Sequence, residues 1–124
     1  MYEVIIEKSF SSAHFLRKYK GKDEPLHGHN WKVQVEFRGN ALVQPEEYLV
    51  DFVEANEELA KIIAKIDYKN INEVPPFDKR NTSAENIARW ICEEFGNTKI
   101  QPKPSRVTVW ETDTGAARFI PDNA

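Results

Sequence analysis

The chain contains a single cysteine, Cys92. An internal disulfide is therefore excluded, and so is a metal site built from several thiolates. If the chemistry of this protein needs a thiol nucleophile, only Cys92 can supply it.

An excess of positive charge is also missing. Seventeen basic and 20 acidic residues give a net charge of −3, which favours neither nucleic acid nor an anionic membrane surface as a partner. No apolar run approaches membrane-spanning length, and the opening MYEVIIEKSF lacks the apolar region of a signal peptide. We expect a cytoplasmic protein with one domain, residues 1–124, and with no nucleic-acid or membrane partner.

The hydrophobic pattern predicts two strands followed by two helices. Residues 2–9 alternate loosely, and residues 31–38 alternate strictly, with apolar side chains at the odd positions from Trp31 to Phe37. The period then changes to that of a helix, with one apolar stripe. That stripe consists of Phe52, Ala55, Leu59, Ile62, Ile63 and Ile66.

A second helix is predicted from a capping-box spacing, in which Thr82 would be the N-cap and Glu85 lies three residues on. Ser83 is the alternative N-cap, and Gly96 a plausible end. Its core stripe consists of Ile87, Trp90, Ile91 and Phe95.

Two further strands follow, residues 106–112 and a short one ending at Phe119, joined by the tight turn Asp113-Thr114-Gly115. The order ββααββ indicates an α+β fold in which a four-stranded antiparallel sheet carries both helices on one face. Four strands do not close a barrel, so we expect the exposed sheet edges to pair in an oligomer.

All three histidines fall within sixteen residues, His14 near the end of the first strand and His27 and His29 just before the second. If the second strand begins early, His27 and His29 share the apolar side with Trp31. Three imidazoles with a vacant fourth position are typical of catalytic zinc, while iron and nickel accept the same ligands. A lone H-x-H pair is nevertheless common without a metal.

Two acids lie in unusual places. Glu111 has the parity of Val107 and Val109, so its carboxylate would leave the apolar side of a strand unless the strand end bends out to water. Asp67 follows the apolar Ile66 at the end of the first helix, where the helix dipole disfavours an acid and loop solvation is the alternative explanation.

Five motifs occur in order over nearly the whole chain: SFSSAHFL, EPLHGHN, VDF, NTSAENIA and VWET. Together they resemble the 6-pyruvoyl-tetrahydropterin synthase family, which includes the 6-carboxy-tetrahydropterin synthases of queuosine biosynthesis. The resemblance implies a tunnelling fold (T-fold), with three subunits closing a twelve-stranded barrel and two trimers stacking as a homohexamer. It also implies Zn²⁺ on His14, His27 and His29, and a pterin substrate anchored by Glu111 through a two-pronged, charge-assisted pairing.

The chain departs from the family pattern at two positions. The cysteine that usually acts as general base, four residues before the first histidine of the HGH motif, is replaced by Asp23. The histidine that usually follows the aspartate matching Asp67 is replaced by Tyr68. Cys92 lies among core residues of the second helix and is interpreted as a small packing group.

The acid Glu24 lies three residues before His27, which resembles a cysteine-lacking subgroup that substitutes for dihydroneopterin aldolase. Our first hypothesis is therefore retro-aldol cleavage of 7,8-dihydroneopterin or its triphosphate to 6-hydroxymethyl-7,8-dihydropterin, in folate biosynthesis. Glu24 would be the acid–base group, with Asp67 and Tyr68 as proton donors or orienting partners. The alternatives are a 6-pyruvoyl- or 6-carboxy-tetrahydropterin synthase, with Glu24 or Asp23 in the role of the thiol, and a non-catalytic pterin-binding paralogue.

Overall fold

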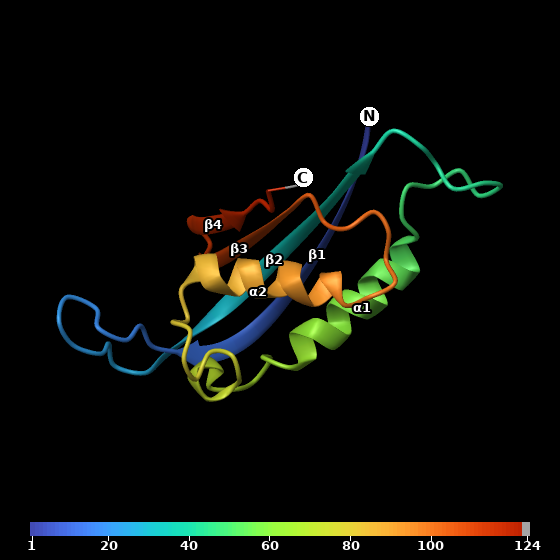
Figure 1. Cartoon of the computed structure of the whole chain (residues 1–124). Helices are drawn as coiled ribbons and strands as arrows, with labels where there is room; N and C mark the ends of the chain where they lie inside the picture. The colour runs from blue at the N-terminus through green and yellow to red at the C-terminus, as the bar shows by residue number, and fades with distance from the viewer. Residues whose placement is uncertain (123–124) are drawn as a thin grey trace.

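The computed structural model describes residues 1–122 and contains one antiparallel sheet with two helices on one face (Figure 1). The sheet order follows the chain: β1 (Tyr2–His14), β2 (His27–Gly39), β3 (Arg106–Thr112) and β4 (Gly115–Phe119). The helices are α1 (Phe52–Ala64) and α2 (Ala84–Gly96), and between them lies one short 3₁₀ turn, η1 (Ile71–Glu73). The predicted α+β architecture is confirmed.

The first two strands are longer than the alternation alone predicts. They pair along their whole length, from Tyr2 opposite Gly39 to His14 opposite His27. The added end of β1 is rich in serine and alanine, which have low strand propensity and little hydrophobic contrast, so the pattern faded there. Hydrogen bonding to β2 keeps this end of β1 in a strand despite its weak pattern. Ser12 and His14 are buried on the same side as Ile6.

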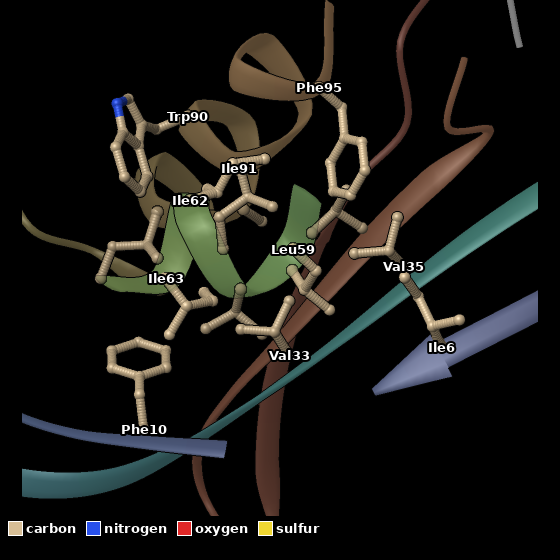
Figure 2. Packing of buried hydrophobic residues seen from close by; sticks show 14 of the residues in the cluster. Ile6, Phe10, Val33, Val35, Leu59, Ile62, Ile63, Trp90, Ile91 and Phe95 are labelled. Atoms are coloured by element: carbon tan, nitrogen blue, oxygen red, sulfur yellow. The ribbon is translucent and has the colours of Figure 1, made fainter. Parts of the chain in front are cut away.

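The core lies between the helices and the covered face of the sheet. Trp31, Val33, Val35 and Phe37 of β2 are fully buried on that face. Figure 2 shows Leu59 and Ile63 of α1 and Ile91 of α2 packed over this layer. Each of these helix residues comes from a stripe with helical spacing, so the period read from the sequence selected the buried faces.

The N-terminus of α2 corrects one prediction. Ser83 is the N-cap, and its side chain accepts a hydrogen bond from the Asn86 backbone N–H at 3.2 Å. Thr82 does not cap the helix because its hydroxyl donates to the Phe15 carbonyl instead. The capping-box reading of Thr82 and Glu85 is therefore wrong.

A second correction concerns α1. Phe52 was expected in its core stripe but is 57% exposed, and its neighbour Val53 is 64% exposed. The stripe begins one turn later, at Ala55, because the first residues of the helix extend beyond the packed layer. Neither helix within residues 1–122 combines the length and the apolar composition needed to cross a membrane.

The outer edge of β1 is partly covered by the segment that follows α1. Ser11 donates its backbone N–H to the Asp67 Oδ1 at 3.0 Å and accepts one from Tyr68 at 2.7 Å. Two residues on, the Ala13 N–H bonds to the Lys69 carbonyl at 2.9 Å. The edge near His14 is thus covered by the chain itself, while the first part of β1 and the outer edge of β4 have no neighbouring strand within residues 1–122.

We expect Leu59→Ala to lower the free energy of unfolding by about 3 kcal/mol, because Leu59 is fully buried and its loss leaves a cavity. Urea denaturation at a fixed protein concentration measures this. Val53→Ala, at an exposed position of the same helix, is the control and should change stability by less than about 1 kcal/mol. Equal effects of the two substitutions would contradict the position of the core.

Candidate metal centre and active site

Three imidazole rings meet at one end of the sheet. His14 is the last residue of β1 and is paired directly with His27, the first residue of β2, while His29 lies two residues on. The ring centroids are 4.8 Å apart for His14 and His27, 5.2 Å for His14 and His29, and 4.8 Å for His27 and His29. The predicted convergence of the three histidines is therefore present.

Backbone carbonyl groups orient two of the rings. The Nδ1 of His14 lies 2.9 Å from the Thr82 carbonyl oxygen, and the Nδ1 of His27 lies 2.8 Å from that of Pro25. A carbonyl only accepts hydrogen bonds, so Nδ1 carries the proton in both neutral rings and the lone pair lies on Nε2. This tautomer is the one that presents Nε2 as a metal ligand.

The cluster passes a test for metal binding that rests on its own unpaired atoms. Nε2 of His29 is buried without a hydrogen-bond partner among the described residues, and Nε2 of His14 faces only the Glu111 carboxylate, which is itself an acceptor and cannot donate to a lone pair. Buried polar atoms of this kind are costly unless something binds them. One ligand nitrogen from each histidine lies within 4.8 Å of the others, and tetrahedral zinc holds such nitrogens about 3.4 Å apart. A small inward movement of the rings would therefore complete a site.

The surroundings of His14 keep its ring neutral. The side chain is 1% exposed and packs edge-on against the Trp31 ring at 4.8 Å. Burial lowers the pKa of His14, an effect partly opposed by its hydrogen bond to Thr82 and by the negative charge of Glu111. Neutral imidazole is the form that binds a metal, so burial lessens the competition with a proton.

Glu111 completes the polar group around the cluster. Its Oε1 lies 3.2 Å from Nε2 of His14, and its side chain is 38% exposed. The carboxylate thus leaves β3 on the side of the buried Val107 and Val109, as its parity predicted, and reaches the site without being sealed from water.

A cavity of about 190 Å³ lies beside this carboxylate, between the start of α2 and the turn that joins β3 to β4. Glu85 lines it together with Glu111. The sequence indicates Glu85 only as a capping residue, and its position beside Glu111 was not predicted. The available signal is an acid in the first turn of the helix that begins directly after the N-cap Ser83.

The loop between β1 and β2 holds the other candidate acids (Figure 1). Glu24 accepts a hydrogen bond from the Leu16 N–H at 2.8 Å through Oε1, and its own N–H bonds to the Leu16 carbonyl at 2.9 Å. Asp23 accepts one from the Lys18 N–H at 3.1 Å. Both side chains brace this loop, and Glu24 stands next to Pro25, whose carbonyl orients His27.

Asp67 and Tyr68 lie on the outer edge of β1. Asp67 bonds to Ser11, three residues before His14, and the Tyr68 side chain is 84% exposed. Among the hydrogen bonds of residues 1–122, neither is bonded to the histidines.

Cys92 lies at the other end of the sheet. It lines a cavity of about 450 Å³ with Arg38, at the end of β2, and Ser105, just before β3. This cavity is larger than the one beside Glu111, yet it contains none of the three histidines. The histidine cluster is therefore kept as the candidate site, and the thiol of Cys92 lies away from it.

The sheet, the helices on one face and the imidazole cluster at the sheet end define the T-fold class. Residues 3–121 match the sequence profile described as 6-pyruvoyl tetrahydropterin synthase. The chain belongs to this family.

Two relatives show how far the similarity extends. The 6-carboxy-5,6,7,8-tetrahydropterin synthase of Haemophilus influenzae is 27% identical, with 96% of this chain and 99% of that protein covered. A Pyrococcus abyssi protein that carries the same name provisionally is 32% identical over 84% of this chain and 80% of its own length.

Solved structures agree with the fold. The 6-pyruvoyl tetrahydropterin synthase of Caenorhabditis elegans superimposes with a TM-score of 0.84 at 23% identity, covering 98% of each chain. A Plasmodium vivax 6-pyruvoyltetrahydropterin synthase, described as a catalytic residue mutant with alanine in place of a glutamate, has a TM-score of 0.71 at 26% identity. It covers 95% of this chain and 96% of its own.

We expect Cys92 to be a poor nucleophile. Burial raises the pKa of its thiol, and the neighbouring Glu93 raises it further, so less thiolate is present near pH 8 than for a free cysteine. Iodoacetamide should therefore label the native protein more slowly than the protein unfolded in urea. Cys92→Ala should keep full metal binding and turnover; loss of turnover would show that the thiol takes part in the reaction.

Proposed function

We propose that this chain is a zinc-dependent tetrahydropterin synthase of the 6-carboxy or 6-pyruvoyl type, which acts on the side chain of 7,8-dihydroneopterin triphosphate. The observation that carries the proposal is the cluster of three imidazoles with a carboxylate 3.2 Å from one of them, in a member of this family. The names of the relatives favour this reaction over the retro-aldol hypothesis.

His14, His27 and His29 would hold the ion through nitrogen atoms whose orientation the backbone sets. Bound zinc would act as a Lewis acid that lowers the pKa of a side-chain hydroxyl of the substrate. The set offers three neutral nitrogens and no thiolate, which is typical of a catalytic rather than a structural zinc site.

Glu24 is our candidate for the acid–base group. A carboxylate beside the site can accept a proton from the pterin side chain and return it. Oε1 of Glu24 is held by the Leu16 N–H, which fixes the side chain and leaves the second oxygen for this task. A catalytic glutamate in the Plasmodium vivax relative supports the assignment. Asp23 is the second candidate.

Glu111 would anchor the pterin ring. Its carboxylate is partly exposed, lines the 190 Å³ cavity and matches the paired N–H donors of a 2-amino-pyrimidinone ring. Such a pairing would place the side chain of the substrate toward the histidines, because Glu111 contacts His14 directly.

Retro-aldol cleavage is the second candidate function. One observation favours it: the only cysteine lies far from the cluster, and a carboxylate is sufficient to deprotonate a hydroxyl. Loss of that proton would break the adjacent carbon–carbon bond, the electron pair would enter the C=N system of the ring, and a returned proton would complete the product. The non-catalytic paralogue remains as a third candidate, since Tyr68 replaces the usual histidine.

We also propose a homohexamer, built as two stacked trimers. The free part of β1 and the outer edge of β4 would pair between copies. Asp67 and Tyr68 are proposed as groups that orient the substrate or donate a proton to it. The Tyr68 side chain is exposed, so it can contact a substrate that is bound outside its own chain.

We expect the purified protein to bind one equivalent of zinc per chain, measured by metal analysis after dialysis. His27→Ala removes one of three ligands and should weaken zinc binding by at least about 100-fold. Gln34→Ala, at a polar position on the uncovered face of the same strand, is the control and should bind zinc like the wild type. A protein that takes up no zinc would refute the proposed centre.

Incubation of the zinc-loaded protein with dihydroneopterin and with its triphosphate separates the candidates. We expect mass spectrometry to identify 6-carboxy- or 6-pyruvoyl-tetrahydropterin from the triphosphate. Formation of 6-hydroxymethyl-7,8-dihydropterin with release of a two-carbon aldehyde would establish the retro-aldol reaction instead. Binding of either pterin without any product would favour the non-catalytic paralogue.

Glu24→Gln tests the acid–base assignment in the same assay. Glutamine keeps an oxygen for the Leu16 N–H but cannot take up a proton, so turnover should fall by about 100-fold or more while zinc is retained. Glu57→Gln, on the exposed face of α1, is the matched control. If Asp23→Asn rather than Glu24→Gln stops turnover, the acid–base role belongs to Asp23.

A further inference from the structure

His14 occupies a position that the sheet alone does not secure. It is the last residue of β1, and beyond it the chain leaves the ladder. The side chain of Asn72 takes over at the next residue: Oδ1 accepts from the Phe15 N–H at 3.0 Å, and Nδ2 donates to the Phe15 carbonyl at 2.9 Å. One side-chain amide thus satisfies both backbone groups, as a neighbouring strand would.

Asn81 repeats this arrangement two residues further on. Its Oδ1 accepts from the Arg17 N–H at 2.9 Å, and its Nδ2 donates to the Arg17 carbonyl at 3.1 Å. We call these paired contacts of Asn72 and Asn81 the asparagine clamps. The Asn86 side chain donates to the Asn81 carbonyl at 3.0 Å and so joins the second clamp to α2. The segment after His14 is therefore held at alternate residues by two asparagines, one from η1 and one from the loop before α2.

Thr82 connects the first clamp, that of Asn72, to the ring of His14. Its hydroxyl donates to the Phe15 carbonyl at 2.9 Å and lies 3.2 Å from the Asn72 Oδ1. Its own carbonyl accepts the Nδ1 hydrogen of His14 at 2.9 Å. Thr82 is fully buried and Asn72 is 5% exposed, so water cannot readily replace these bonds.

We propose that Thr82 and Asn72 are positioning residues for metal binding, and that they act through the orientation of His14. The Thr82 side chain fixes the backbone beside His14, and its carbonyl fixes the tautomer and the direction of the ring. The inference rests on the proposed metal centre but assigns a role to residues outside the ligand set.

The physical reason is that a ligand held in place before the metal arrives pays less entropy on binding. Without the Thr82 hydroxyl, the Phe15 carbonyl loses a partner, and the carbonyl that orients His14 loses its anchor. Outer hydrogen-bond partners of metal ligands typically contribute about 10- to 100-fold in affinity. Serine at this position would keep the hydroxyl and only lose a methyl group.

The test compares Thr82→Val, Thr82→Ser and Asn72→Ala with the wild type. Zinc affinity is measured by competition with a chromophoric chelator, and Co²⁺ spectra report the coordination geometry. Thr82→Val and Asn72→Ala should weaken zinc binding by about tenfold or more, and Thr82→Ser should restore it. Thr108→Val is the control, because Thr108 is also buried and its hydroxyl is also hydrogen-bonded, as the acceptor from Arg118 Nε, on the other face of the sheet.

Urea unfolding of the metal-free proteins separates positioning from stability. Thr82→Val and Thr108→Val should lose similar amounts of stability, but only the former should lose zinc affinity. Unchanged zinc affinity in Thr82→Val, or an equal loss in Thr108→Val, would overturn the inference. If Thr82→Val does not fold, unchanged zinc affinity in Asn72→Ala overturns it. Failure of the wild type to bind zinc would instead refute the proposed function itself.

Discussion

The pairing of His14 with His27 at the end of the β1–β2 ladder is the constraint on which the site depends. Antiparallel register places these residues directly opposite each other, and alternation places His29 on the same side. A shift of one residue would turn the rings of one strand to the other face. The long ladder opposes such a shift, because it would also expose Trp31, Val33 and Val35, which are fully buried. The hydrophobic core therefore sets the geometry of the histidine cluster.

The core sets the position of the histidine rings, and polar contacts then fix their orientation. Two of the three rings donate Nδ1–H to a backbone carbonyl, which leaves their Nε2 atoms for an ion. The carbonyls come from different places, the loop before α2 and the loop before β2. A metal centre at this position thus depends on the folding of segments that are far apart in the sequence, and the asparagine clamps beyond His14 hold those segments together.

The chemistry of the site is that of carboxylates and imidazoles. Glu111 and Glu85 line one cavity, Glu24 braces the loop between the histidine strands, and the thiol of Cys92 lies at the opposite end of the sheet. Burial makes that thiol less acidic, so it is suited to packing rather than to catalysis. An enzyme with this arrangement would exchange protons through a carboxylate, whichever bond of the substrate it breaks.

The order and type of the helices and strands and the shared side of His27 and His29 could be predicted from the sequence, because hydrophobic period and strand alternation are local properties. The parity of Glu111 in β3 also pointed to the side on which its carboxylate contacts His14, although the register of β3 with β4 shifts between Trp110 and Thr112. The full length of β1, the choice of Ser83 over Thr82 as the N-cap and the exposure of Phe52 were decided by tertiary contacts. So were the contacts of Thr82, whose hydroxyl bonds to Phe15 and whose carbonyl bonds to His14, both far away in the sequence. No periodicity encodes such contacts, because they exist only when the loop before α2 reaches the end of β1.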